Sequence, residues 1–211
     1  MRNTALRADT REHILDAADR LLARFGYKKM TMDDLAQEVG IGKGTIYLHF
    51  ASKEEVALSR IDRIVENLLE RLRAVASTDA TIAARLRQML LVRVLYRFDS
   101  VQHYTQSIND VLAAVRPALL ARREHYFREE ARIFAEVLKE GKRRGVFDCA
   151  DPEATARTLV HATNSLLPYS LSPRELGERG EIEEKAARIA DLVLKGLLRR
   201  ERPGRAKLKP V

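Results

Sequence analysis

The chain has 211 residues, 45% of them hydrophobic and 32% charged, a balance that predicts a globular protein and excludes a disordered one. No apolar run approaches the roughly 20 residues that cross a bilayer, the first residues lack the apolar segment of a signal peptide, and the single cysteine, Cys149, excludes an intrachain disulfide, so we expect a cytoplasmic protein. The net charge of +8 is weak evidence for nucleic-acid binding, because six basic residues and one acidic residue after Leu198 account for +5 of it.

Apolar residues recur at helical spacing from the start of the chain. The first apolar stripe consists of Ile14, Ala18, Leu21 and Phe25. Asp9 or Thr10 is a suitable N-cap for this first helix, and Gly26 is suited to end it. A second, short helix is predicted to begin at Thr31, whose hydroxyl can cap it, and to stop at Gly40.

After the turn at 40–42, another short helix is predicted to run through Thr45 to about Phe50. Ser52 and Glu55 then match the S-x-x-E capping box and open a long helix. Further helical patterns cover roughly 81–98, 101–114, 117–144, 152–170 and 182–200, with loops at 142–150 and 171–181. Since no segment demands a strand, the predicted fold class is all-α.

The segment 40–50, GIGKGTIYLHF, could cradle phosphate, either that of a nucleotide or that of DNA. A nucleotide-binding P-loop has the pattern G-x-x-x-x-G-K-[S/T] and follows a buried strand. Here Gln37 stands where the first glycine is needed, Gly44 follows the Gly-Lys pair, and the preceding segment is helical. These differences exclude the nucleotide site.

Two short helices joined by a glycine-containing turn are the geometry that places the second helix in the DNA major groove. Gly42 and Gly44 keep the start of that helix free of bulky side chains, so its backbone can approach the duplex closely. Ile46 and Phe50 should face the protein core. The side chains expected to reach DNA are Lys43, Thr45, Tyr47 and His49. A surface helical hairpin without DNA contacts is the alternative that the spacing leaves open.

Lys53 is unusual because a cation near a helix N-terminus is unfavourable unless an anion lies beside it. A DNA phosphate would be such an anion, held by Lys53 and by the free N–H groups of the first turn.

The run from Thr31 to Glu54, TMDDLAQEVGIGKGTIYLHFASKE, closely resembles the DNA-binding domain of TetR-family transcriptional regulators, and 14–18 and 25–27 are similar to that family's first helix. The resemblance covers roughly 8–68 and implies a helical homodimer with a three-helix DNA-binding head and a larger effector domain. Gly42 departs from the Ser or Thr often found at that cap, which costs little. The DNA contacts that spacing and resemblance together predict are Thr31, Lys43, Gly44, Thr45, Tyr47, His49 and Lys53.

Three regions are therefore expected. They are a helix-turn-helix DNA-binding domain over 8–68 with its motif at about 31–50, a helical ligand-binding and dimerisation domain over 69–200, and a basic, disordered tail over 201–211. The resemblance implies that the last two long helices pair with their copies in a four-helix dimer interface. The alternative is that both pack only within their own domain. The expected interface residues are Leu159, Thr163, Leu166, Ile189, Val193 and Leu197.

A pocket for a small-molecule effector is expected among the middle helices, where apolar walls should meet a few polar groups. The candidate pocket residues are Met89, Arg93, Tyr96, His103, Tyr104, Tyr126, Phe127, His161 and Asn164. No carboxylate or cysteine falls at ligand spacing around the two histidines of this set, so we expect neither a metal nor a cofactor. The sequence does not reveal the effector.

The leading prediction is a ligand-responsive, sequence-specific DNA-binding regulator, a repressor that a small molecule releases from a palindromic operator. No nucleophile–base set indicates an enzyme. Two other functions stay open at this point. One is a nonspecific basic DNA-binding protein that uses its C-terminal tail, and the other is an all-α carrier of small molecules.

Overall fold

The computed structural model describes residues 2–102, 107–171, 175 and 177–199. Within these residues the regular structure is helical, apart from one isolated β-bridge between Phe147 and Leu198, which confirms the all-α prediction. The helices are α1 (Arg2–Lys29), α2 (Met32–Val39), α3 (Lys43–His49), α4 (Lys53–Ala76), α5 (Ile82–Asp99), α6 (Ile108–Arg143), α7 (Pro152–Ala162) and α9 (Arg179–Leu197), with 3-10 turns η2 (Thr163–Leu166) and η3 (Pro168–Ser170).

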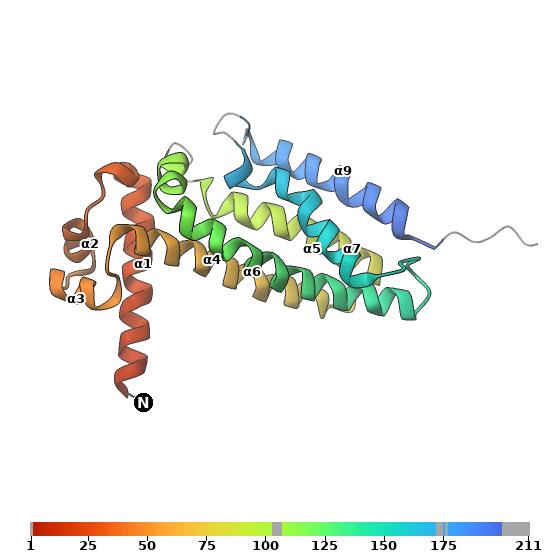
Figure 1. Ribbon diagram of the computed structural model, residues 1–211, viewed down its shortest axis with the longest axis horizontal. Helices are drawn as coiled ribbons and strands as arrows, with labels where there is room; N and C mark the ends of the chain where they lie inside the picture. The colour runs from red at the N-terminus through yellow and green to blue at the C-terminus, as the bar shows by residue number, and fades with distance from the viewer. Residues whose placement is uncertain (1, 103–106, 172–174, 176, 200–211) are drawn as a thin grey trace, which may run out of the picture.

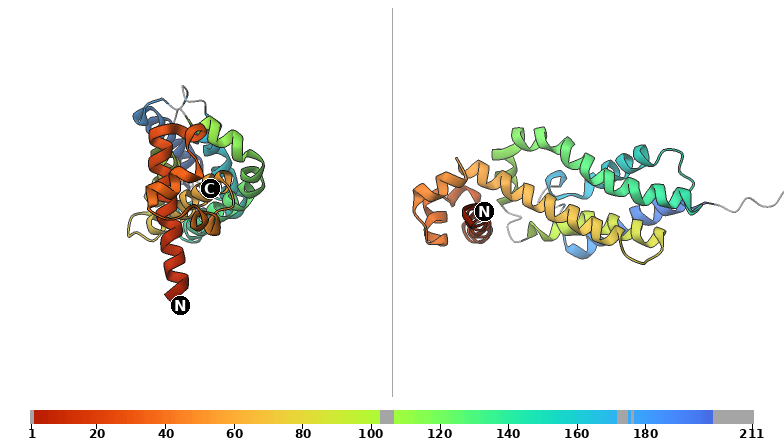
Figure 2. Two further views of the ribbon diagram at one scale, coloured as in Figure 1. Left: turned by 90° about the vertical axis from the view of Figure 1, so that its left-hand side faces the viewer. Right: turned by 90° about the horizontal axis from the view of Figure 1, so that it is seen from below.

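The elements form a small head and a long body (Figure 1). The head consists of α1, α2, α3 and the start of α4, and α1 lies across the long axis of the molecule. Helix α4 leaves the head and runs along the body, where it lies beside α5 and α6 (Figures 1 and 2). Helices α7 and α9 complete the body.

The residues predicted to cap the helices form the expected capping contacts. The hydroxyl of Thr31 accepts a hydrogen bond from the backbone N–H of Asp34, and the Asp34 carboxylate accepts from the backbone N–H of Thr31. Gly40 ends α2 at a φ of 75°, a conformation that favours glycine. The hydroxyl of Ser52 accepts from the backbone N–H of Glu55 at the start of α4.

The first helix differs from expectation at its start. Helix α1 begins at Arg2 rather than at Asp9 or Thr10, because the preceding residues include no glycine or proline to interrupt helical hydrogen bonding. Gly26 does interrupt the helix, with a φ of 75° and a ψ of 167°, and a further turn then runs to Lys29.

Two later boundaries also differ. The predicted helices at 101–114 and 117–144 form one helix, α6, with Pro117 inside it, and its N-terminal half arches away from α4 (Figure 2). The helix predicted over 152–170 stops at Ala162 and continues as η2 and η3. Pro168 accounts for the break between these two turns, since a residue before proline favours extended backbone and Leu167 has a ψ of 147°.

The core of the head continues into the body. Leu15, Leu35 and Ile46 belong to the same buried cluster as Phe98 of α5 and Val111 of α6. A second cluster fills the far part of the body and includes Leu72, Leu86, Leu90, Phe134 and Leu159. The head thus shares one core with α5 and α6, and α1 contacts α6 directly, which matters for communication between sites. No described helix is both long and apolar enough to span a lipid bilayer.

Candidate DNA interface and effector cavity

Helix α3 has one buried face and one open face. Ile46 is fully buried and Phe50 is 1% exposed, so both anchor the helix to the head as predicted. On the other face, Tyr47 is 47% exposed and Leu48 is 75% exposed. This face of α3 is therefore open to a partner.

Lys43 and Gly44 stand at the open N-terminal end of α3. The Lys43 ammonium donates to the Asp33 carboxylate at 2.8 Å, and this hydrogen bond raises the pKa of Lys43. The pair lies in solvent, where such pairs exchange readily for other charged partners. Apart from its chain neighbours and the backbone of α3 itself, no described heavy atom lies within 4 Å of where a Cβ on Gly44 would be, so the backbone there is open to approach. Thr45 in the first turn of α3 and His49 at its C-terminal end are half-buried.

Thr31 and Lys53 have internal partners, of which the Thr31 cap was predicted and the partners of Lys53 were not. The Thr31 hydroxyl donates to Asp34 at 2.7 Å as part of the α2 cap. The Lys53 ammonium donates to the backbone carbonyls of Tyr27 and Met30, at 3.1 and 3.2 Å, and lies 4.4 Å from the centre of the Tyr27 ring. Carbonyl oxygens near the end of α1 thus supply the negative partner that Lys53 needs. Lys53 therefore links α1 to α4, and its contact with a DNA phosphate remains a prediction.

Further contacts connect the head to the body. Arg63 of α4 donates to three α1 carboxylates, at 3.1 Å to Glu12, 2.7 Å to Asp16 and 2.8 Å to Asp19. Lys28 of α1 pairs with Asp110 of α6 at 3.0 Å. Movement of α4 or of the start of α6 would therefore act on α1.

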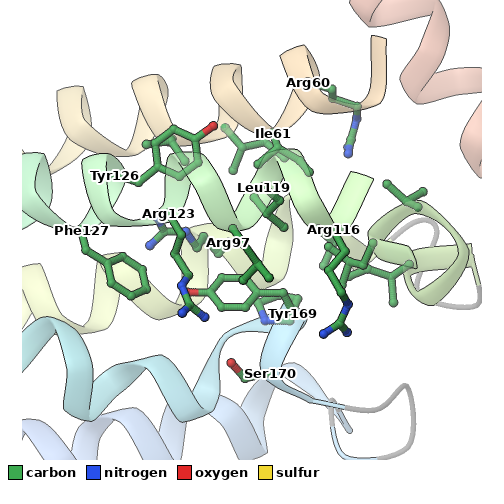
Figure 3. Close-up of a pocket in the computed structure, with 18 residues that line it drawn as sticks. Arg60, Ile61, Arg97, Arg116, Leu119, Arg123, Tyr126, Phe127, Tyr169 and Ser170 are labelled. Carbon is green, nitrogen blue, oxygen red and sulfur yellow. The ribbon is translucent and has the colours of Figure 1, made fainter. Parts of the chain in front are cut away.

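A cavity of about 180 Å³ lies in the body between α4, α5, α6 and η3 (Figure 3). Its walls are mainly apolar, and part of its lining lies on the two helices, α4 and α6, that contact α1. The lining residues are Arg60, Ile61, Ile64, Val65, Arg97, Val101, Ile108, Val111, Leu112, Arg116, Leu119, Leu120, Arg123, Tyr126, Phe127, Pro168, Tyr169 and Ser170.

Of the predicted effector residues that the structure describes, Tyr126 and Phe127 line this cavity. Met89 is instead fully buried in the second core cluster, and Tyr96 lies over the guanidinium of Arg71. His161 is exposed on α7 and meets Phe127 edge to face. These three positions are therefore corrected: they do not line the cavity.

The remaining predicted effector residues lie behind the cavity or outside the described part of the chain. Asn164 accepts a hydrogen bond from the hydroxyl of Tyr169, which does line the cavity. Arg93 is fully buried and shares Glu130 with the lining residue Arg97, but neither Arg93 nor Asn164 lines the cavity, so these two positions are also corrected. His103 and Tyr104 lie outside the described residues.

Sequence reasoning missed the cavity's arginines and Tyr169. A signal for the arginines was present, because Leu112, Arg116, Leu119, Arg123 and Tyr126 follow each other at helical spacing. They form one face of α6. Tyr169 carried no comparable signal, since it reaches the cavity from a 3-10 turn.

A buried ionic network lies behind the cavity. Glu130 accepts from Arg93 at 2.6 Å and from Arg97 at 2.7 and 3.1 Å, and Arg93 also donates to the Thr163 hydroxyl at 2.7 Å. Burial by itself would raise the pKa of Glu130, but the charges and hydrogen bonds of the two arginines lower it from 4.5 to about 2. Two buried cations thus share one anion. No group of three or more His, Cys, Asp or Glu in the described ranges is arranged to hold a metal ion.

The expected dimer residues divide into two groups. Leu159 and Thr163 are buried within the chain's own core, and the Thr163 hydroxyl donates to the Leu159 carbonyl, so these two positions are corrected. The other four are partly exposed and remain predictions: Leu166, Ile189, Val193 and Leu197. Leu192, which was not predicted, is 68% exposed on α9.

Comparison with known proteins places two matches on this chain. Residues 14–59 match the family described as bacterial regulatory proteins, tetR family. Residues 118–190 match the family described as tetracyclin repressor-like, C-terminal domain. The first match covers the helices that present the open face of α3, and the second covers most of α6, all of α7 and much of α9.

Individual relatives agree with these matches. The uncharacterised HTH-type transcriptional regulator YhgD of Bacillus subtilis is 26% identical over 72% of this chain and 79% of its own. An HTH-type transcriptional repressor of Mycobacterium tuberculosis is 40% identical over 39% of this chain and 42% of its own. For several such relatives the match spans less than half of their length. A transcriptional regulator of Cytophaga hutchinsonii has a similar fold, with a TM-score of 0.75 and 21% identity over 89% of this chain and 98% of its own.

Proposed function

Because the chain belongs to the TetR family of bacterial transcriptional regulators, we propose that it binds a palindromic operator as a cytoplasmic homodimer and is released by a small-molecule effector. The family consists of transcription factors rather than enzymes, which agrees with the expectation from sequence. Two relatives from Mycobacterium tuberculosis are named repressors and one from Mycolicibacterium smegmatis is named an activator, and we propose repression for this chain.

The observation that carries the DNA-binding proposal is the open face of α3. Tyr47 and Leu48 project from a helix whose other face is locked in the head by Ile46 and Phe50. Helix α3 has seven residues and so is about 10 Å long, which suits a major groove roughly 12 Å wide. We propose that Lys43, Gly44, Thr45, Tyr47 and His49 face the duplex, while Thr31 and Lys53 mainly hold the helices in position.

The proposed control mechanism follows from what surrounds the cavity. Helix α4 contributes Ile61 and Ile64 to its wall and also binds α1 through Arg63. Helix α6 contributes Val111 and binds α1 through Asp110. An effector that fits the cavity better when α4 and α6 are displaced would favour a head orientation in which the two copies of α3 no longer match the operator.

The test begins by selecting bound sequences from random duplex DNA with the full chain, followed by footprinting on the selected site. We expect a short palindrome protected over two adjacent major-groove segments on one face of the duplex. Diffuse protection without sequence preference would contradict the proposal. It would favour the nonspecific DNA-binding protein, whose binding should then disappear when the chain is truncated before Arg199.

The variant Tyr47→Ala tests whether the open face of α3 binds the operator. It removes an exposed side chain, so we expect the thermal unfolding midpoint to stay unchanged while operator affinity falls at least tenfold, about 1.4 kcal/mol. Unchanged operator affinity in Tyr47→Ala would mean that the open face of α3 is not the DNA-binding surface.

A further inference from the structure

The charged side chains that line the cavity in the body are positive. Among the described residues, its lining includes four arginines, Arg60, Arg97, Arg116 and Arg123, and no aspartate or glutamate. We propose that the effector is an apolar molecule with one anionic head group, a carboxylate or a phosphate, and that Arg116 and Arg123 bind this head group. The inference rests on the proposed function of the cavity as the effector site.

Two of the four arginines already have carboxylate partners, whereas the other two do not. Arg60 pairs with Asp19, and Arg97 pairs with Glu130. In the described part of the chain, no carboxylate forms an ion pair with Arg116 or Arg123, although their neighbour Arg122 pairs with Asp62. Both extend from α6 toward the segment that carries Tyr169 and Ser170 (Figure 3). Arginine binds carboxylate and phosphate through paired hydrogen bonds, so these two side chains suit such a head group.

The buried network next to the cavity adds to the positive charge. Arg93 and Arg97 share the single carboxylate of Glu130, which leaves one net positive charge in the interior. One terminal nitrogen of Arg93, Nη2, has no hydrogen-bond partner within the described residues. Uncompensated buried charge is costly, and an anion in the neighbouring cavity would reduce that cost. A cationic ligand would increase it.

The rest of the lining requires an apolar body. Ile61, Ile64 and Val65 of α4 face the cavity, as do Leu112 and Leu119 of α6. The volume of about 180 Å³ is many times the roughly 10–15 Å³ that holds one water on the same measure. A short aliphatic chain or a single ring fits this space, whereas a small inorganic anion would leave the apolar walls without contacts.

Direct binding measurements on the full chain test the ligand class without DNA. Isothermal titration calorimetry would compare four probes: octanoate, octyl phosphate, 1-octanol and acetate. We expect octanoate or octyl phosphate to bind at least tenfold more tightly than 1-octanol, because 1-octanol has the same chain but no charge. Acetate should not bind detectably, since it lacks the apolar body. Which of the two anions binds more tightly identifies the head group as carboxylate or phosphate.

Two variants test whether Arg116 and Arg123 cause the preference for anionic ligands. The double variant Arg116→Gln/Arg123→Gln should lose at least tenfold in affinity for the preferred anion and keep its affinity for 1-octanol, which also shows that the cavity is intact. Both residues are exposed, so folding should not suffer. Arg143→Gln, an exposed arginine on the same helix but outside the cavity lining, is the matched control and should bind like the unaltered chain.

The outcomes separate this inference from the proposed function. Equal affinity for 1-octanol and the anions, full anion affinity in the double variant, or no binding of either anion would each overturn the ligand class, even if operator binding is normal. Anion binding by a preparation that selects no DNA sequence would uphold the ligand class and overturn the regulatory function.

Discussion

Two lysines of the head show how differently one residue type can be used. Lys43 lies in solvent beside Asp33, whereas Lys53 donates to two backbone carbonyls near the end of α1. Spacing and family resemblance predicted both as DNA contacts. In the fold, Lys43 has an exposed partner that a phosphate can replace, whereas Lys53 holds α1 against α4.

The Lys43–Asp33 pair leads to opposite effects in two variants. Lys43→Ala should weaken operator binding and reduce the slope of log affinity against log salt concentration by about one, because one phosphate contact is lost. Asp33→Asn should strengthen binding, since it removes a negative charge that competes with phosphate for Lys43. Electrophoretic mobility shifts over a range of salt concentrations measure both effects.

Lys53→Met shows the contrast between the two lysines. It should lower the thermal unfolding midpoint, because it removes the hydrogen bonds to the carbonyls of Tyr27 and Met30. Lys43→Ala should leave the midpoint unchanged. If Asp33→Asn leaves DNA affinity unchanged or lowers it, Lys43 does not exchange its partner for DNA.

Glu130 should make stability depend on pH in a defined range. The pKa of Glu130 is lowered from 4.5 to about 2 in the folded protein, so its contribution is fully present above about pH 4.5 and is lost as the pH falls toward 2. Glu130→Gln leaves Arg93 and Arg97 without their anion and should cost about 3–5 kcal/mol in free energy of unfolding at neutral pH. The difference from the unaltered chain should shrink as the pH falls through this range.

Urea unfolding at a series of pH values checks the Glu130 prediction. Glu136→Gln, on the exposed side of the same helix, is the control and should change stability little at any pH. A stability difference for Glu130→Gln that does not vary between pH 4.5 and 2 would show that the carboxylate charge is not what stabilises the network.

At the scale of single elements, α3 is short, and its composition lowers the stability of the helix while leaving its backbone accessible. Seven residues form a marginal helix on their own, so its packing through Ile46 and Phe50 must stabilise it. Gly44 weakens it further, yet no described atom near Gly44 would be disturbed by a larger residue. We attribute this glycine to close approach by the duplex rather than to packing.

Gly44→Ala tests this explanation. Alanine favours helix over glycine by up to about 1 kcal/mol, so the variant should be at least as stable as the unaltered chain. The added methyl group should nevertheless lower operator affinity, because it stands between the α3 backbone and the duplex. Gly180→Ala is the matched control, since Gly180 occupies the same second position in α9 and is equally free of neighbours. Unchanged operator affinity in Gly44→Ala would contradict close backbone approach.

At the scale of the whole molecule, the exposed side of α9 is the clearest candidate for a contact between two copies. Leu192 is 68% exposed and Ile189 is only half-buried, while Ile182, Ala186 and Ala190 cover the side that packs inside the chain. An operator palindrome needs two heads in fixed relation, so DNA affinity should depend on this surface.

Leu192→Asp should therefore convert the proposed dimer to a monomer, because it would place a charge in the proposed apolar contact. Sedimentation velocity measures the shift, and operator affinity should fall together with dimer content. Thr78→Asp, an exposed change in the turn between α4 and α5, should alter neither property. If the Leu192→Asp variant is still a dimer, the interface does not lie on this side of α9.

The sequence by itself determined the helix-turn-helix and its family. Its determinants are local: the Thr31 and Ser52 caps, the Gly40 turn and the spacing of Ile46 and Phe50 all lie within one short run. Local hydrogen bonds and helical periodicity need no knowledge of distant residues. The course of α6 was predicted less well, because whether Pro117 breaks or bends a helix depends on what packs around it.

Only the tertiary structure decided the cavity, its charge and the role of Lys53. The cavity joins residues from α4, α5, α6 and η3, which are far apart in the chain. Whether an arginine is neutralised depends on which carboxylate the fold brings to it: Arg97 meets Glu130, while Arg123 meets none among the described residues. Pairing of charges acts through space and over short distances, so it cannot be inferred until the distant segments are placed.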